Sequence, residues 1–253
     1  MDVMSFLESI FRWFHVVAGI LWIGLLYFLN FVNAGFEGTL DAESKRKVVP
    51  ELRPRVLFWF RMGAAVTWIL GALLLLMVFY HGRVALLDPV GGSFGLGGLL
   101  MFGVVIASPF IYDALVKTAM KELRTAFVAG LVLAIGLAFV FELVGFGPRG
   151  VMIHLGSTFG TIMAFNVWFR IWPAQQKIIT AIKNGEAPDA ALVGLAGLRS
   201  RHNTYLSVPL VFFMLDQHNL GWATHPIAYG LVVLVGWGVV YHLYDRAAQV
   251  KGF

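Results

Sequence analysis

Apolar runs of about 20 residues recur from one end of the chain to the other, and they limit what it can fold into. About 20 helical residues cross the roughly 30 Å of hydrocarbon in a bilayer. The runs predict seven membrane-spanning helices, at about 9–34, 56–80, 96–117, 123–146, 150–172, 204–219 and 226–246. With 59% hydrophobic and only 13% charged residues, nothing remains for a separate soluble domain. We therefore expect an all-α, polytopic helix bundle that forms one transmembrane domain over residues 1–253.

Three connections between the runs are polar or rich in glycine. Residues 35–55 predict a polar loop that contains Pro50 and Pro54. Residues 88–98 are rich in glycine, which excludes the interior of a span. The longest connection, 173–201, contains QQKIITAIKNGE and then a Pro-Asp pair ahead of AALVGLAGL. This pattern predicts two short helices at the cytoplasmic membrane interface.

Basic residues predict the orientation of the bundle. Of the 19 lysines and arginines, only Arg12, Arg83 and Arg149 fall on one side of the predicted spans. Cytoplasmic loops of membrane proteins carry an excess of basic residues. The N-terminus is therefore predicted outside and the C-terminus in the cytoplasm. The net charge of +5 reflects this topology, and no nucleic-acid partner is expected.

The chain contains no cysteine. This excludes disulfides, thiolate metal sites, catalytic thiols and the C-x-x-C-H motif that attaches a c-type haem. The first residues, MDVMSFLES, are acidic where a signal peptide has a basic region, so the first apolar run is predicted to be a retained span.

Seven histidines differ in predicted depth. Toward the outside lie His15, His81, His154, His218 and His225, and toward the cytoplasm lie His202 and His242. His81 and His225 fall at loop edges, where an exposed ring needs no special explanation. The stretch from Arg201 to His218 places a histidine near each membrane face, roughly 24 Å apart along a helix. An imidazole at membrane depth is a functional hypothesis by default.

The outer histidines predict a haem site. His15 lies one helical turn before Gly19, whose missing side chain leaves a recess for the edge of a porphyrin. His154 begins HLGSTFGTIMAFN at a similar depth. Two imidazoles at equal depth on different helices can ligate one iron from opposite sides. We expect His15 and His154 to form this pair, with His218 as a substitute or as a group close to it.

The inner histidines predict a second haem site. His242 follows Gly238 by one turn, and its depth matches that of His202. The spacing thus permits two b-type haems, one in each leaflet. The competing interpretation is that the histidines are structural and belong to a transporter or scaffold. Zinc or copper is less favoured because few carboxylates are placed to complete such a site.

Other features of the spans have ordinary explanations. Gly156 and Gly160 form a G-x-x-x-G pattern that favours close helix packing. Acidic residues in or near spans are most simply helix-end residues or ion-pair partners, with proton relay as the alternative; they are Asp113, Glu142 and Asp216. Cytoplasmic arginines are most simply solvated, with binding of a purine anion as the alternative; they are Arg53, Arg55, Arg61, Arg199 and Arg201.

Three stretches together resemble the membrane domain of the bacterial membrane-bound urate oxidase (urate hydroxylase) family. They are HVVAGILWIGLLYFLNFVNAGF, HLGSTFGTIMAFNVWFRIWPAQQK and SRHNTYLSVPLVFFMLDQH. Histidines at motif positions of this resemblance are His15, His154, His202 and His218, with His242 at a weaker one. Asn30, Asn166 and Asn203 also match motif positions.

The resemblance implies a multi-pass protein of the bacterial inner membrane that oxidises urate or a related small reductant. Members of the family add a further span and a C-terminal cytochrome c, and this sequence has neither. Electrons would then pass through membrane haems to a separate cytochrome c, a quinone or a partner cytochrome subunit. Two alternatives remain: an electron-transfer subunit between quinol and a soluble cytochrome without urate chemistry, or a non-redox membrane transporter or scaffold.

Overall fold

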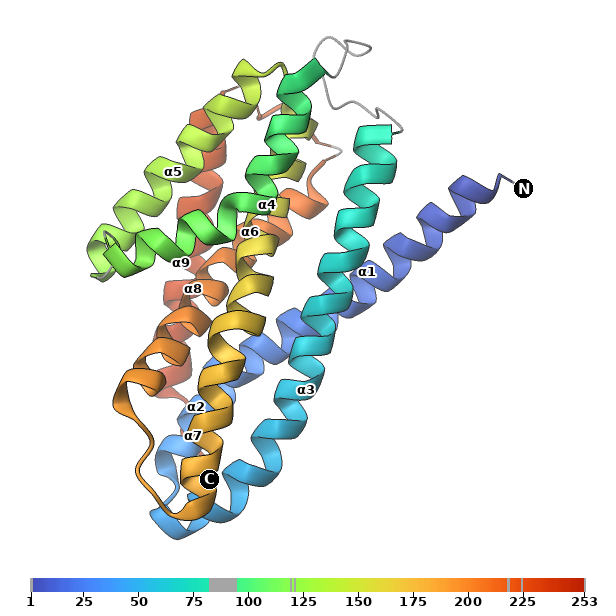
Figure 1. The fold of residues 1–253 in the computed structure, drawn as a ribbon. Helices are drawn as coiled ribbons and strands as arrows, with labels where there is room; N and C mark the ends of the chain where they lie inside the picture. Colours follow the sequence, from blue (N-terminus) through green and yellow to red (C-terminus); the bar gives the residue numbers. More distant parts are fainter. Residues whose placement is uncertain are drawn as a thin grey trace.

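Seven continuous helices form the computed structural model, which describes residues 2–81, 95–118, 120, 122–217, 219–223 and 225–252 (Figure 1). The α-helical segments are α1 Val3–Tyr27, α2 Ala34–Thr39, α3 Ala42–Leu74, α4 Gly95–Thr118, α5 Leu123–Leu143, α6 Pro148–Asn166, α7 Trp172–Asn184, α8 Ala190–Leu215 and α9 Pro226–Gln249. The described residues contain no strand, which confirms the all-α prediction.

Three π-helical segments join or extend these helices. η1 (Phe28–Asn33) links α1 to α2, η2 (Leu75–His81) extends α3, and η3 (Val167–Ile171) links α6 to α7. Wide turns of this kind are rare and frequently occur at functional sites. Hydrophobic periodicity does not reveal them, because each changes the pattern over only a few residues.

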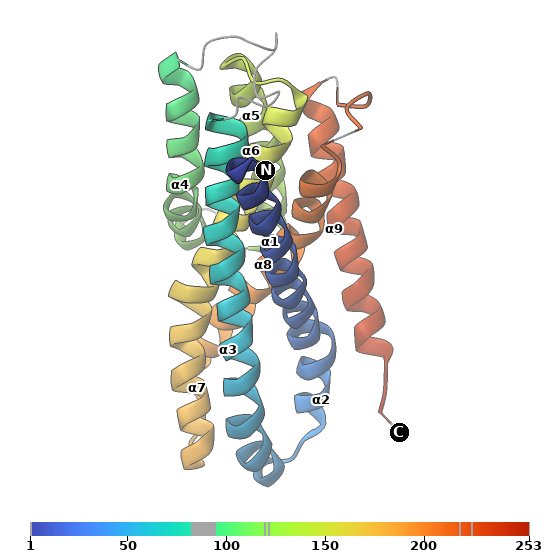
Figure 2. The ribbon, with the colours of Figure 1, turned by 90° about the vertical axis from the view of Figure 1, so that its right-hand side faces the viewer.

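Six of the seven helices are long and apolar enough to cross a membrane. Their lengths run from 20 to 40 residues, and the protein is a multi-pass membrane protein. α8 does not qualify, because its middle turns carry Arg199, Arg201, His202 and Asn203. The predicted sixth span, 204–219, is the apolar second half of this helix, which ends at Leu215. The N-terminal end of α1 and the C-terminal end of α9 lie toward opposite ends of the bundle (Figure 2). Which end faces the cytoplasm stays a prediction.

The predicted loop at 35–55 is wrong, because α2 and α3 occupy all of it except Leu40 and Asp41. Asp41 caps α3 by accepting a hydrogen bond from the backbone N–H of Ser44, at 2.7 Å. Pro50 and Pro54 lie inside α3. Proline is unfavourable within a helix, so tertiary contacts must hold this part of α3. One of them is the ion pair between Arg53 and the buried Glu37 of α2.

The two short helices predicted within 173–201 are also wrong as separate elements. The first is α7, which continues from α6 and η3 as one helix of 37 residues. The second is the first half of α8, which begins at Ala190 with Asp189 as its cap. Only residues 185–189 connect α7 to α8, and Gly185 takes the left-handed conformation (φ 76°) that ends α7.

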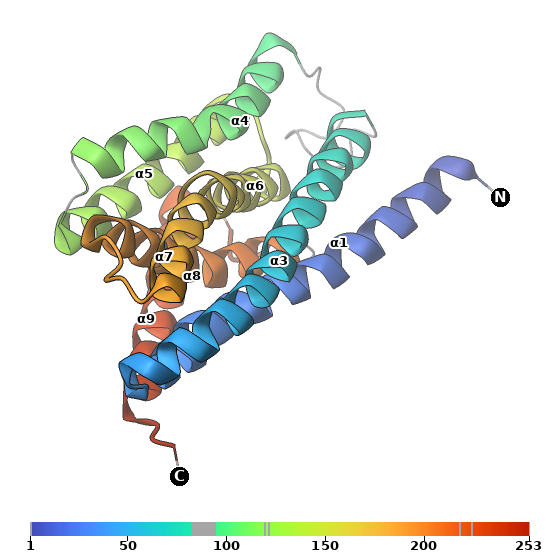
Figure 3. The same ribbon diagram turned by 60° about the horizontal axis from the view of Figure 1, so that its bottom comes forward.

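α6 and α8 form the interior of the bundle. Of the most apolar 18 consecutive residues in the α6–α7 helix, 83% are buried, whereas the corresponding share is 11–33% in the other candidate spans. α8 packs against α1, α6, α7 and α9 (Figure 3). Gly156 and Gly160 face Met214 and Leu210 of α8, which confirms the predicted glycine contact surface. The polar side chains of His154 and Asn166 on α6 and of Arg199 and Asn203 on α8 are buried in the protein.

Candidate functional site

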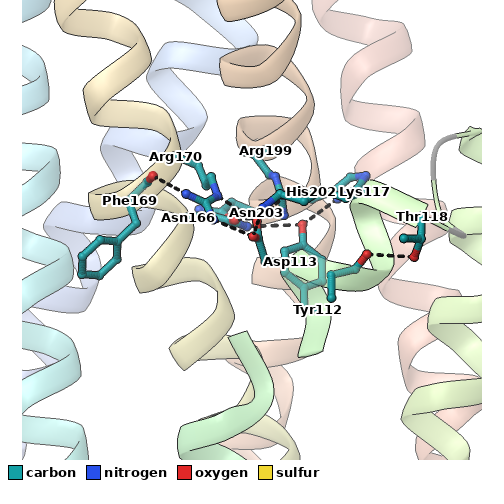
Figure 4. Close-up of polar contacts among 11 residues, drawn as sticks. Tyr112, Asp113, Lys117, Thr118, Asn166, Phe169, Arg170, Arg199, His202 and Asn203 are labelled. Atoms are coloured by element: carbon teal, nitrogen blue, oxygen red, sulfur yellow. Dashed lines mark hydrogen bonds and ion pairs between the residues drawn. The ribbon is translucent and has the colours of Figure 1, made fainter. Parts of the chain in front are cut away.

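One buried carboxylate, that of Asp113 on α4, forms ion pairs with three basic side chains (Figure 4). Arg170 of η3 donates through Nε at 2.8 Å, and Arg199 of α8 donates through Nη2 at 2.6 Å. Lys117, one turn along α4, places Nζ 2.8 Å from the second carboxylate oxygen. The ion-pair prediction for Asp113 is confirmed.

The buried part of the cluster is the pair of Arg199 with Asp113, whereas the Lys117 side chain is 61% exposed and that of Arg170 is 28% exposed. The Arg199 side chain is only 1% exposed, and its Nε has no hydrogen-bond partner within the described part of the chain. A buried guanidinium is tolerated only when it is paired, and the loss of its partner leaves a strongly unfavourable charge. Asp113 therefore fixes α4 to α8 and η3, and the solvated state expected for Arg199 is wrong.

Beside Asp113 on α4, the Tyr112 hydroxyl lies 2.7 Å from Nδ1 of His202 on α8. Asn166 of α6 donates to the same hydroxyl at 3.3 Å and to Oδ1 of Asn203 at 2.9 Å. Both asparagines are fully buried. Two of the three asparagines at motif positions thus join α4, α6 and α8 through hydrogen bonds.

The direction of the Tyr112 hydroxyl proton determines which ring nitrogen of His202 carries a proton. The oxygen of Tyr112 accepts from Asn166, and its proton has one acceptor within reach among the described residues, Nδ1 of His202. This arrangement assigns the imidazole proton to Nε2. Nε2 has no hydrogen-bond partner among the described residues, and His202 lines a cavity. His202 consequently presents an N–H donor.

A cavity of about 290 Å³ lies against this pair of side chains. Its wall is apolar and aromatic and comes mainly from α4, α5, α6, α8 and α9, with Tyr112, His202, Phe127, Tyr205 and Trp237 among the lining residues. Thr158 Oγ1 and Trp237 Nε1 belong to lining residues and are buried without a hydrogen-bond partner in the described structure. The volume of the cavity is near the lower limit of about 300 Å³ that is typical of small-molecule sites.

His15 lies apart from this cavity, between α1 and α3. Its Nδ1 donates to the carbonyl of Thr67 at 2.9 Å, which leaves Nε2 as a free acceptor. A Cβ added at Gly71 would meet His15 Cε1 at 2.9 Å, whereas Gly19 faces Thr67. The recess beside the ring therefore comes from Gly71 on α3, and its attribution to Gly19 is wrong.

His154 is fully buried and uses both ring nitrogens. Nδ1 donates to the carbonyl of Gly150 at 2.7 Å, and the Tyr80 hydroxyl lies 2.7 Å from Nε2. Phe141 and Phe146 surround the ring, with centroids 5.1 and 4.5 Å away. No nitrogen of His154 is open to a metal in this arrangement, and its partners differ from those of His15.

The other histidines lie outside these environments. His242 is exposed on α9 and does not line the cavity that His202 faces. His218 lies outside the described residues. His81 is exposed, and His225 caps α9 by accepting from the N–H of Ile227 at 3.2 Å, so both fit their expected positions at loop edges. The described residues contain no group of three His, Asp or Glu side chains suited to a bare metal ion.

Two further basic side chains differ from the solvated state expected for them. The Arg53 guanidinium donates through Nε to Glu37 at 2.8 Å and through Nη1 to Gln175 at 3.1 Å. Arg61 stacks over Trp172, with 3.6 Å between its guanidinium carbon and the ring centroid. Arg55 and Arg201 are exposed, as predicted. Glu142 is half-buried, and Asp216 accepts from Trp222 Nε1 at 2.6 Å at the end of α8.

A second, partly buried network joins α8 to η1 and α9. Tyr244 of α9 donates to Asn30 Oδ1 at 2.9 Å and lies 3.2 Å from Thr204 Oγ1. Asn30 donates to Ser200 Oγ at 2.9 Å. The sequence indicates Asn30 through its motif and places Tyr244 near the depth of His202 and His242, but it gives no signal for Tyr112 or Tyr80. Tyrosines near helix ends look like interfacial anchors, and only the fold reveals which of them turn inward.

A family model described as urate oxidase N-terminal matches residues 36–250. Comparisons with curated proteins and with solved structures found no match. The match includes the Asp113 cluster and the Tyr112–His202 contact, whereas Asn30 and His15 lie before its first residue.

Proposed function

The chain belongs to the urate oxidase N-terminal family, and we propose that it is a membrane-embedded oxidoreductase that oxidises urate or a related small reductant and carries b-type haem. The family match supports urate as the substrate class. The geometry of His15 supports the haem. A separate cytochrome c or a quinone is the proposed electron acceptor.

His15 has the arrangement of an axial ligand. Histidines that ligate metals usually donate their second ring N–H to a carbonyl or carboxylate, which fixes the tautomer and the orientation of the ring. The bond from Nδ1 to Thr67 does this, and Nε2 keeps its lone pair. The recess at Gly71 leaves the ring room against α3. A haem held by His15 would supply one-electron transfer within the membrane.

The remaining predicted ligands fit less well. His154 would have to release the Tyr80 hydroxyl before it could ligate iron. His202 presents a donor rather than a lone pair, and His242 is exposed on another face of α9. We therefore propose one haem on His15 and leave the second axial ligand unassigned.

The haem proposal is tested by absorption spectroscopy of purified protein from haem-replete cells. We expect a b-type spectrum in the wild type and its loss in His15→Ala. His81→Ala is the matched control, because His81 is exposed and is not a proposed ligand. A colourless wild type would favour the non-redox transporter or scaffold.

The substrate proposal has its own test in the same preparation. Urate consumption is measured with a water-soluble electron acceptor, so that the natural acceptor need not be known. We expect consumption by the wild type. A haem spectrum without urate consumption would instead favour an electron-transfer subunit that works between quinol and a soluble cytochrome.

A further inference from the structure

We propose that the cavity beside His202 binds the head group of a lipid-soluble quinone that enters from the membrane. The cavity of about 290 Å³ accommodates a small planar ring, and its walls include the aromatic side chains of Phe127, Tyr205 and Trp237. None of these features is used by the His15 site. Binding stands on the cavity alone, and the role of the quinone as electron acceptor rests on the proposed function.

The cavity borders the lipid-facing surface of the bundle. Ile111 of α4 and Leu133 of α5 line it and are 55% and 49% exposed. A second apolar cavity of about 350 Å³ shares Phe127, Tyr205 and Trp237 with the first and reaches exposed Leu234 on α9. An apolar ligand with a hydrocarbon tail can therefore place its ring inside and keep its tail against α5 and α9.

A hydrogen-bond donor lies among the residues that line the cavity. A quinone carries carbonyl acceptors on opposite edges of a flat ring. His202, which lines the cavity, offers Nε2–H to one of these carbonyls. A hydrogen bond from this donor to the ligand would stabilise the bound ring.

The charges around the cavity favour a neutral ligand over a purine anion. Among its described lining residues there is no lysine, arginine, aspartate or glutamate. Arg199 lies behind Tyr112, 5.1 Å from the centroid of its ring, and is paired with Asp113. Moving an anion into an apolar cavity without a paired charge is strongly unfavourable. A bound quinone would take up two electrons and two protons to become the quinol, and the oxidation of the urate-class reductant with water would release both the electrons and the protons.

Titration of a short-tailed benzoquinone into the protein in quinone-free lipid nanodiscs tests the assignment. Ala126→Phe fills the cavity from α5, and His202→Phe keeps a ring while removing the donor. Ala129→Phe is the matched control, because Ala129 lies on α5 outside the cavity lining. We expect no detectable binding in Ala126→Phe, about tenfold weaker binding in His202→Phe, and unchanged binding in Ala129→Phe.

Two results would overturn the quinone site. One is a wild type that does not bind the quinone, or equal affinity in all four proteins. The other is urate binding that Ala126→Phe abolishes and that displaces the quinone, which would assign the cavity to the purine. Urate consumption with a water-soluble acceptor separates this failure from that of the proposed function. If consumption persists without quinone binding, only the quinone site is lost; if wild type consumes no urate, the proposed function fails whatever the titration shows.

Discussion

Tyr112 and His202, 90 residues apart in the chain, meet with 2.7 Å between the phenol oxygen and the imidazole Nδ1. The contact joins α4 to α8 at the wall of the aromatic cavity. It lies directly beside the ion pairs of Asp113 with Arg170 and Arg199. The interior of this apolar bundle therefore has a polar centre, and three helices depend on it for their relative positions.

Removal of the carboxylate charge of Asp113 is expected to destabilise the protein. Asp113→Asn leaves the buried Arg199 without its ionic partner, and breaking a buried pair of this kind typically costs about 3–5 kcal/mol. Thermal unfolding in detergent should show a clear drop in Tm. Glu51→Gln is the control, because its pair with Arg55 is 71% exposed on both sides and should contribute less than about 1 kcal/mol. Equal Tm values for the two variants would contradict the structural role of Asp113.

A methyl group at Gly71 is expected to displace the His15 ring. The added Cβ would lie 2.9 Å from Cε1, so the ring must move and the bond to Thr67 is lost. We expect Gly71→Ala to lower the haem content per protein without unfolding the bundle. Gly24→Ala is the matched control, since nothing lies within 4 Å of its added Cβ. Full haem content in Gly71→Ala would argue against His15 as the ligand.

The contact of α8 with α9 depends on a glycine opposite a proline. A Cβ at Gly236 would meet Cδ of Pro209 at 2.9 Å and its backbone nitrogen at 3.2 Å, and neither atom moves freely. Overpacking of this kind costs about 1–3 kcal/mol. Gly236→Ala should therefore lower Tm, whereas Gly238→Ala, which has open space, should leave it unchanged or raise it. Matching Tm values would show that α8 and α9 pack differently.

The apolar runs predicted the seven helices because hydrocarbon length sets a strong and simple rule. They did not predict helix ends in polar segments, where tertiary contacts decide. α3 passes through Pro50 and Pro54, aided by the pair of Arg53 with Glu37, and α8 begins 14 residues before the predicted span at 204. From composition alone, such basic segments are predicted to be loops.

Histidine depth gave candidate ligands but not their neighbours. Depth is a coordinate along the membrane normal, and it leaves the direction of each ring around its helix open. His15 and His154 have similar predicted depths, yet one faces Thr67 and the other faces Tyr80. The partners that set their chemistry are a backbone carbonyl and a tyrosine 74 residues away in the chain, and neither has a local sequence signal.

The central claim is that urate delivers electrons to a haem held by this chain. A difference spectrum of the purified, oxidised protein before and after addition of urate under anaerobic conditions tests it most directly. We predict reduced b-type haem bands in the wild type and none in His15→Ala. A wild-type haem that dithionite reduces and urate leaves oxidised would contradict the account.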